Sequence, residues 1–348
     1  MEKSDVDVIH SKKHLRWSLT ILCLVIGVIL TVLIALIIGP INIPMTTVFK
    51  ILLHFPPSWP DSYRVIIMDV RLPRILLGAL VGSALAVAGC AMQGLFKNPM
   101  ASPYILGISS GAAFGASLAI VLGSSLGRGI FTIPVMAFIF AIVTIFLVYN
   151  IAKSRGRAPI ETLLLAGIAV GAFFTAQVSL MKYIAGEELR SIVFWLMGGF
   201  WASSWDKAAV AFPSIILGVA IMMLFGRDLN VMLMGEDHAV DLGINVEYVK
   251  KIILIFSSLV TAAAVSVSGI IGFVGLIIPH IMRLIVGPDH RILLPSSCLV
   301  GAMFLIGTDT LARTIIQPTE IPVGIITASF GAPFFLYLLR QRKRVTGW

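Results

Sequence analysis

The sequence predicts an all-α polytopic membrane protein with about ten transmembrane helices and both termini in the cytoplasm. Composition is the first observation behind this prediction. Of the 348 residues, 58% are hydrophobic and 12% are charged, with a mean hydropathy of +0.99, whereas soluble domains carry about 25% charged residues. The apolar residues also form long, nearly charge-free runs, which favour membrane helices over the short alternating segments of a β-barrel. The placement of Lys and Arg between these runs is the third observation.

Ten runs are long enough, or nearly so, to cross a bilayer. They cover residues 17–39, 75–96, 103–123, 131–151, 161–185, 208–226, 250–268, 270–286, 292–312 and 321–339. No small-x-small cleavage motif ends the first run, so we expect an uncleaved helix there rather than a signal peptide. Residues 252–282 carry no charge and exceed one crossing, and the small residues 266–269 and Gly272 indicate a turn between two helices.

The positive charges favour one orientation. With the N-terminus in the cytoplasm and the spans alternating, 17 of the 26 Lys and Arg residues lie inside and 9 outside, as the positive-inside rule expects. The single predicted domain, residues 1–348, then has a cytoplasmic tail at 1–16 and a cytoplasmic loop at 227–249. The net charge of +9 belongs to these flanking segments, so membrane lipid and no nucleic acid is the expected environment. Residues 41–63 form an external, proline-rich loop with a short amphipathic piece at 45–54.

The cytoplasmic segment 227–251 is the most charged interior part of the chain. Gly235 and Gly243 divide it into short helical pieces. Such a segment is equally consistent with a solvated connection and with a docking site for a soluble partner.

Three arginines lie at the predicted external side. Arg71 and Arg74 flank Leu72-Pro73 before the second run, and Arg313 follows the ninth. Snorkelling at the membrane interface is favoured over a basic rim for an acidic partner. Asp309 lies four residues before Arg313, so the two side chains share a helix face and are expected to form an ion pair.

Several chemistries are disfavoured by residues that are missing or wrongly placed. The chain has no P-loop, so ATP would have to bind another subunit. Ionisable groups such as Glu161 are scarce in the spans, which argues against a secondary carrier.

Residues 107–111 (GISSG) match a nucleophile elbow, with His280 as a possible base, but they open a membrane helix and are better explained by close packing than by an intramembrane hydrolase. The three cysteines, Cys23, Cys90 and Cys298, and the histidines lack metal-binding spacing, so neither a metal nor a cofactor is expected.

The amino-acid sequence of several segments resembles that of the FecCD family of ABC-transporter permeases. The matching segments are residues 71–74 (RLPR), 91–115 (AMQGLFKNPMASPYILGISSGAAFG), 163–174, 194–201, 242–251, 268–295 and 320–335. This resemblance covers nearly the whole chain after about residue 60. It implies a permease subunit, not itself an enzyme, that imports iron-siderophore complexes, haem or vitamin B12 across a bacterial or archaeal cytoplasmic membrane. The implied partners are a second permease copy or a sister permease, two cytoplasmic ATP-binding subunits and an extracytoplasmic solute-binding protein.

The resemblance also implies roles for individual residues. Arg71, Arg74 and Arg313 fall on family positions whose arginines dock the binding protein, which reverses the preference for snorkelling. ATPase coupling is implied for Gly235, Glu236, Asp237, His238, Ala239, Asp241, Leu242 and Gly243. The cytoplasmic gate is implied at Asn98 and Met100, with a second constriction near Phe174 and Thr175. A secondary carrier or an intramembrane hydrolase is the alternative.

Overall fold

The computed structural model describes residues 3–55, 59–123, 129, 131–153 and 159–346. Arg128, Arg155 and Arg157, which contribute to the charge bias, lie outside these ranges, as do Pro56 and Pro57 of the predicted external loop. All regular secondary structure within these ranges is helical, which confirms the predicted fold class.

The elements follow one another along the chain as a series of long helices joined by short ones. They are α1 (Lys3–Ile37), α2 (Met45–Leu52), α3 (Asp61–Val65), η1 (Ile66–Arg71), α4 (Leu72–Leu95), η2 (Pro103–Leu106), α5 (Ile108–Val121), α7 (Thr132–Ala152), α8 (Ile160–Ile184), η3 (Gly186–Glu188), α9 (Leu189–Met197), α10 (Trp205–Leu224), α11 (Gly226–Leu233), α12 (Glu236–Asp241), α13 (Val246–Ser268), α14 (Val274–Val286), α15 (His290–Thr314) and α16 (Val323–Thr346). Among the described residues, seven helices are long and apolar enough to cross a membrane, and α5, α14 and α16 contain shorter apolar helices. Each of the ten predicted runs coincides with one of these ten helices.

The predicted turn inside the long charge-free run is present. α13 ends at Ser268 and α14 begins at Val274. Gly269, which follows α13 directly, has a φ of +68°, a conformation that glycine adopts at little cost. The small residues at this point therefore separate the two helices as expected.

Three segments are more helical than the sequence suggested. α3, η1 and α4 form one continuous apolar helix over Asp61–Leu95, and Pro73 is tolerated because it sits in the first turn of α4. α1 begins at Lys3, so helix runs through the predicted cytoplasmic tail. α9 was not predicted, because nine residues give too short a pattern to recognise.

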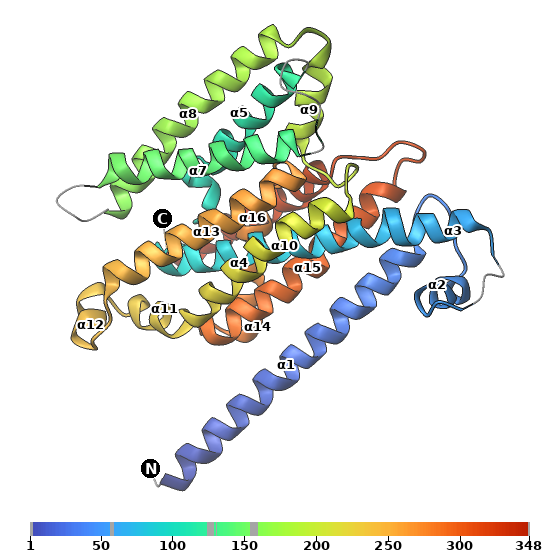
Figure 1. Ribbon diagram of the computed structural model, residues 1–348. Helices are drawn as coiled ribbons and strands as arrows, with labels where there is room; N and C mark the ends of the chain where they lie inside the picture. Colours follow the sequence, from blue (N-terminus) through green and yellow to red (C-terminus); the bar gives the residue numbers. More distant parts are fainter. Residues whose placement is uncertain (1–2, 56–58, 124–128, 130, 154–158, 347–348) are drawn as a thin grey trace.

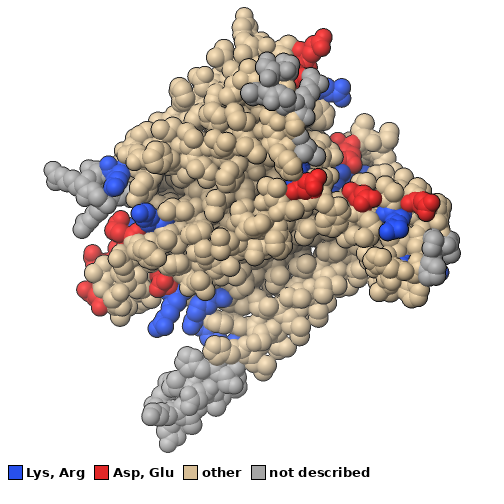
Figure 2. Space-filling model, viewed as in Figure 1, with Lys and Arg blue, Asp and Glu red and all other residues tan. Residues whose placement is uncertain are grey.

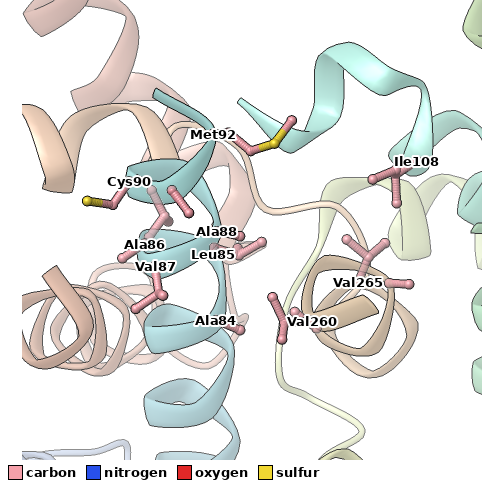
Figure 3. Packing of buried hydrophobic residues seen from close by; sticks show 14 of the residues in the cluster. Ala84, Leu85, Ala86, Val87, Ala88, Cys90, Met92, Ile108, Val260 and Val265 are labelled. Atoms are coloured by element: carbon pink, nitrogen blue, oxygen red, sulfur yellow. The ribbon is translucent and has the colours of Figure 1, made fainter. Parts of the chain in front are cut away.

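The helices form two groups. α5, α7, α8 and α9 lie together in one group, and α4, α10 and α13 to α16 form the other, with α1 running along its side against α15 (Figure 1). α4 is the central helix of the second group. Nearly all of its residues are buried, and its small side chains pack against residues such as Val260 and Val265 of α13 (Figure 3).

Glycine lets the helix backbones approach one another closely. A side chain at Gly82 of α4 would collide with the carbonyl oxygen of Gly301 in α15, and a side chain at Gly301 would collide with that of Gly82. In the same way, a side chain at Gly89 would collide with the carbonyl oxygen of Gly275 in α14. Gly111 of the GISSG segment lies against Thr144 of α7. The small residues therefore serve helix packing, as expected for membrane helices.

The two ends of α1 contact opposite ends of the second helix group. Lys13, near the start of α1, pairs with Asp289 between α14 and α15, whereas the end of α1 meets Arg71. α1 therefore runs the length of this group, and the assignment of its ends to the inside and the outside stays a prediction. On the face in Figure 2, described charges gather toward two ends and leave an uncharged band between them.

Candidate translocation path and partner surfaces

A buried ionic network lies at the predicted external end of α4 and α15. Arg74 directs its Nε (2.9 Å) and Nη2 (2.8 Å) to the carboxylate of Asp309. Its Nη1 lies 2.9 Å from Glu320, just before α16. This forked arrangement uses the planar geometry of guanidinium. One arginine therefore ties α4, α15 and the start of α16 together.

Arg313 and Arg71 extend this network. Arg313 Nε lies 3.4 Å from Asp309 Oδ2, which confirms the predicted pair, and its Nη2 donates to the carbonyl oxygen of Ala35 in α1. Arg71 donates to the carbonyl oxygens of Leu36, Ile37 and Ile41. Both arginines thus fasten the end of α1 to the main helix group.

The structure corrects one expectation about these arginines. Arg71, Arg74 and Arg313 are 2%, 5% and 4% exposed, because their guanidinium groups are turned toward partners within the chain. They do not form an exposed basic rim in this conformation, and the docking role stays a prediction. Glu320 was missed, although it is the one acidic residue after Asp309 in the sequence, and that isolation was the available signal.

The predicted coupling segment forms a compact, capped unit. α12 is preceded by Gly235 (φ +135°) and followed by Gly243 (φ +82°). The N–H groups of Gly243 and Ile244 donate to the carbonyl oxygens of Val240 (2.8 Å) and Ala239 (2.9 Å), which is the Schellman arrangement for ending a helix. The prediction of short helical pieces punctuated by two glycines is therefore confirmed.

α12 is anchored on one side and open on the other. Ala239 is fully buried in the main core, and Lys250 of α13 lies 2.7 Å from Glu236. On the open side, Val240 and Leu242 are about two-thirds exposed. A hollow of about 510 Å³ beside them is lined by Glu236, Asp237, Val240, Gly243, Ile244, Asn245, Val246 and Glu247. This surface combines apolar and acidic groups and suits a protein partner.

The predicted cytoplasmic gate is a tight turn between α4 and η2. Lys97 has a φ of +48°, which ends α4. The side chain of Asn98 is exposed, and its Oδ1 accepts a hydrogen bond from the N–H of Met100 (2.9 Å). Tyr104 anchors the following turn by donating to the carbonyl oxygen of Ile271 (2.9 Å). The turn is thus exposed at its tip and fixed at its base.

Phe174 and Thr175, the residues of the second predicted constriction, are neighbours on α8 whose side chains have different surroundings. Phe174 is buried, and its ring centroid lies 5.6 Å from that of Phe114 and 6.3 Å from that of Phe140, so it packs within the first helix group, and its role at a constriction stays a prediction. Thr175 is exposed on α8, and its hydroxyl donates to the carbonyl oxygen of Gly171 (2.8 Å).

A polar link that sequence reasoning missed connects three elements. Asn230 of α11 donates to Asp289 (2.7 Å) and accepts from the backbone N–H of His290 (2.7 Å). The His290 ring is buried and packs so tightly on Gly94 that a side chain there would collide. Hydrogen bonds from Arg291, Asn230 and Lys13 lower the pKa of Asp289 below its usual range. The link therefore runs from α11, beside the coupling segment, to the end of α4, beside the Asn98 turn.

The catalytic alternative gains no support from the geometry. The GISSG segment follows a 3-10 helix, with Gly107 at φ +77°, rather than the strand of a nucleophile elbow. In the described part of the chain, no three His, Cys, Asp or Glu side chains are grouped as metal ligands.

Comparisons with known proteins point in one direction. The model of the FecCD transport family matches residues 26–341. The chain is 49% identical over 284 residues (82% of this chain, 76% of the relative) to the cobalamin import system permease protein BtuC of Halobacterium salinarum. It is 41% identical to the hemin transport system permease protein HmuU of Yersinia pestis, over 93% of this chain and 98% of the relative. A solved structure described as an inward-facing metal-chelate type ABC transporter matches with a TM-score of 0.82 and 35% identity, covering 92% of this chain and 98% of that one.

Proposed function

We infer the function from the family, because the chain belongs to the FecCD transport family, whose model matches residues 26–341. It is accordingly a multi-pass membrane permease of the ABC-importer type. We propose that its solute is a metal chelate such as a ferric siderophore, haem or cobalamin. The names of the relatives support this class, since they include permeases for cobalamin and hemin.

We propose that the permease works in the cytoplasmic membrane with three kinds of partner. These are a second permease subunit, two cytoplasmic ATPase subunits and a solute-binding protein on the external side. The lack of a P-loop in the sequence supports a separate ATPase, because the chain has no glycine-rich loop of that kind to hold the phosphates of ATP. The open face of α12 is the proposed ATPase contact.

The geometry suggests how ATP-driven movement would reach the path. A push on α12 would be passed to α13, because buried Ala239 and the Lys250–Glu236 ion pair attach α12 there. α11 would carry the same movement through Asn230 and His290 to the end of α4. The exposed turn at Asn98 and Met100 would then open or close the cytoplasmic exit. The permease makes no covalent bond to its solute.

Reconstitution of the complete importer tests this proposal. The permease, its ATPase and its binding protein are placed in vesicles, and uptake of a ferric siderophore, haem or cobalamin is measured with and without ATP. We expect uptake only with all three components and ATP. Uptake by the permease alone under a proton gradient would overturn the proposal and favour a secondary carrier.

A pair of matched variants tests the ATPase contact. Val240→Ser with Leu242→Ser removes two exposed apolar side chains from the α12 face and is expected to reduce copurification of the ATPase at least tenfold. Leu224→Ser removes a side chain that is 78% exposed at the end of α10 and is expected to leave copurification unchanged. Equal retention of the ATPase by both variants would move the contact away from α12.

A further inference from the structure

Two cavities lie side by side where the two helix groups meet. The first has a volume of about 420 Å³ and reaches Arg190, Phe194 and Trp195 of α9. The second, of about 270 Å³, lies between α7, α10 and α13. Four residues line both cavities, namely Pro134, Lys207, Ser266 and Val267. The shared lining makes the two cavities adjoining chambers with chemically different walls.

The first chamber is lined by two cations, Arg190 and Lys207, and the carboxylate of Glu188 lies next to it, where it accepts a hydrogen bond from Ser191 (3.1 Å). Among the described residues, neither Arg190 nor Lys207 takes part in an ion pair. Lys207 uses one of its three donors on the carbonyl oxygen of Ala202 (2.7 Å), and the Arg190 guanidinium lies 5.5 Å from the ring centroid of Phe194. Donors therefore remain for an anion, and phosphate oxygens are among the strongest acceptors for Lys and Arg.

Aromatic side chains surround these cations. Phe194, Trp195 and Trp201 line the same chamber, and the rings of Phe194 and Trp201 lie edge to face. Tryptophan beside Lys or Arg is typical of the depth at which lipid headgroups meet the hydrocarbon region. The predicted topology places this chamber at the external end of α10 and α13, which is such a depth.

The second chamber is almost wholly apolar. Its walls include Phe131, Val135, Phe138, Val210 and Ala211. Val135 and Val210 are about half exposed on the outer side of α7 and α10, so the chamber opens toward the surroundings of the helices. In a membrane, those surroundings are lipid chains.

We propose that this site binds an anionic phospholipid, with the phosphate held by Arg190 and Lys207 and one acyl chain in the apolar chamber. A zwitterionic lipid carries its own cation, which offsets the charge of its phosphate, and a soluble anion would leave the apolar chamber unused. The ligand would touch α7 and α9 of one helix group and α10 and α13 of the other (Figure 1). Bound lipid therefore fastens the two groups together at their external side, and this role does not depend on the transported solute.

Lipid binding to the purified full-length protein tests the proposal. The protein in neutral detergent is titrated with phosphatidylglycerol, phosphatidylcholine or inorganic phosphate, and the thermal unfolding temperature and the retained lipid are measured. We expect stabilisation and retention with phosphatidylglycerol only. Equal effects of phosphatidylcholine would overturn the role of the cations, and equal stabilisation by inorganic phosphate would make the site a simple anion site.

Variants separate the headgroup from the chain. Arg190→Gln with Lys207→Gln is expected to lower the affinity for phosphatidylglycerol about 25-fold, since each cation near a membrane surface is worth about fivefold. Lys182→Gln with Arg64→Gln removes the same charge from the same predicted side without touching either chamber and should leave the affinity unchanged. Ser214→Phe narrows the apolar chamber and should weaken lipid binding with both cations in place. An affinity unaltered by the first and third variants would overturn the proposal.

Discussion

The two ends of α15 hold charged clusters of opposite construction. At the predicted external end, Arg74, Asp309 and Arg313 are buried, with side chains at most 6% exposed. At the predicted cytoplasmic end, Asp289 joins Lys13 and Arg291, whose side chains are 44% and 49% exposed. Water can therefore replace a lost partner at the cytoplasmic end, and it cannot do so at the external end.

The difference in burial gives the same kind of ion pair two roles, a permanent link between helices at one end and a breakable contact at the other. A buried charge without its partner is strongly destabilising, so the external network holds α1, α4, α15 and α16 in one arrangement. An exposed pair contributes little and can break and re-form. The exposed cluster lies beside α11 and the end of α4, where movement is needed if the coupling proposal is right. The helices are thus held rigidly at the predicted external end and loosely at the predicted cytoplasmic end.

The largest expected effect comes from removing the shared carboxylate. Asp309→Asn leaves Arg74 and Arg313 buried without their common counter-ion and should lower the free energy of unfolding by about 3–5 kcal/mol. Thermal unfolding in detergent measures this loss. Asp289→Asn, the matching change at the other end, should cost much less. Equal losses for the two variants would remove the contrast between the ends.

Arg74→Gln sharpens the same comparison and tests docking separately. Asp309 keeps Arg313 as a partner in this variant, so we expect a smaller loss of about 1–3 kcal/mol. Binding of the solute-binding protein is measured at a temperature where the variant is folded. Weaker binding with unchanged stability would favour the docking role over the structural one, while Arg64→Gln serves as an exposed control on the same helix.

Asn230→Ala examines the neutral part of the cytoplasmic link. It removes the bonds to Asp289 and His290, and we expect a loss of about 1–2 kcal/mol. In vesicles, ATP hydrolysis should continue while the solute carried per ATP falls. Asp228→Ala changes the same helix without breaking the link and should transport normally. A normal ratio of transport to hydrolysis in Asn230→Ala would exclude the link from coupling.

The fold was far more predictable than the contacts at the helix ends. Long apolar runs report directly on apolar helices, so each of the ten runs coincides with a helix of the described chain, seven of them long enough to span a membrane, and the turn near Gly269 was found as well. The small residues of the GISSG segment indicated close packing, which depends on residue size alone. By contrast, the network of Arg74 and Glu320 joins residues 246 positions apart. No periodicity reports such a contact, and the sequence could not tell a buried arginine from an exposed one.

The smallest expected effect concerns Lys13 and also depends on pH. Lys13→Ala breaks an exposed pair with Asp289 and should cost no more than about 1 kcal/mol, less at high salt. The hydrogen-bond partners of Asp289, Lys13 among them, lower the pKa of its carboxyl group in the folded protein. The stability that this carboxylate contributes is therefore fully present above the pKa of about 4 that it has in the unfolded chain, and it is lost as the pH falls through the lower pKa of the folded protein. The difference between Lys13→Ala and the unaltered protein should therefore shrink as the solution is acidified below pH 4. A difference that grew on acidification would mean that Lys13 acts through another group, and the loose cytoplasmic cluster would then need a different anchor.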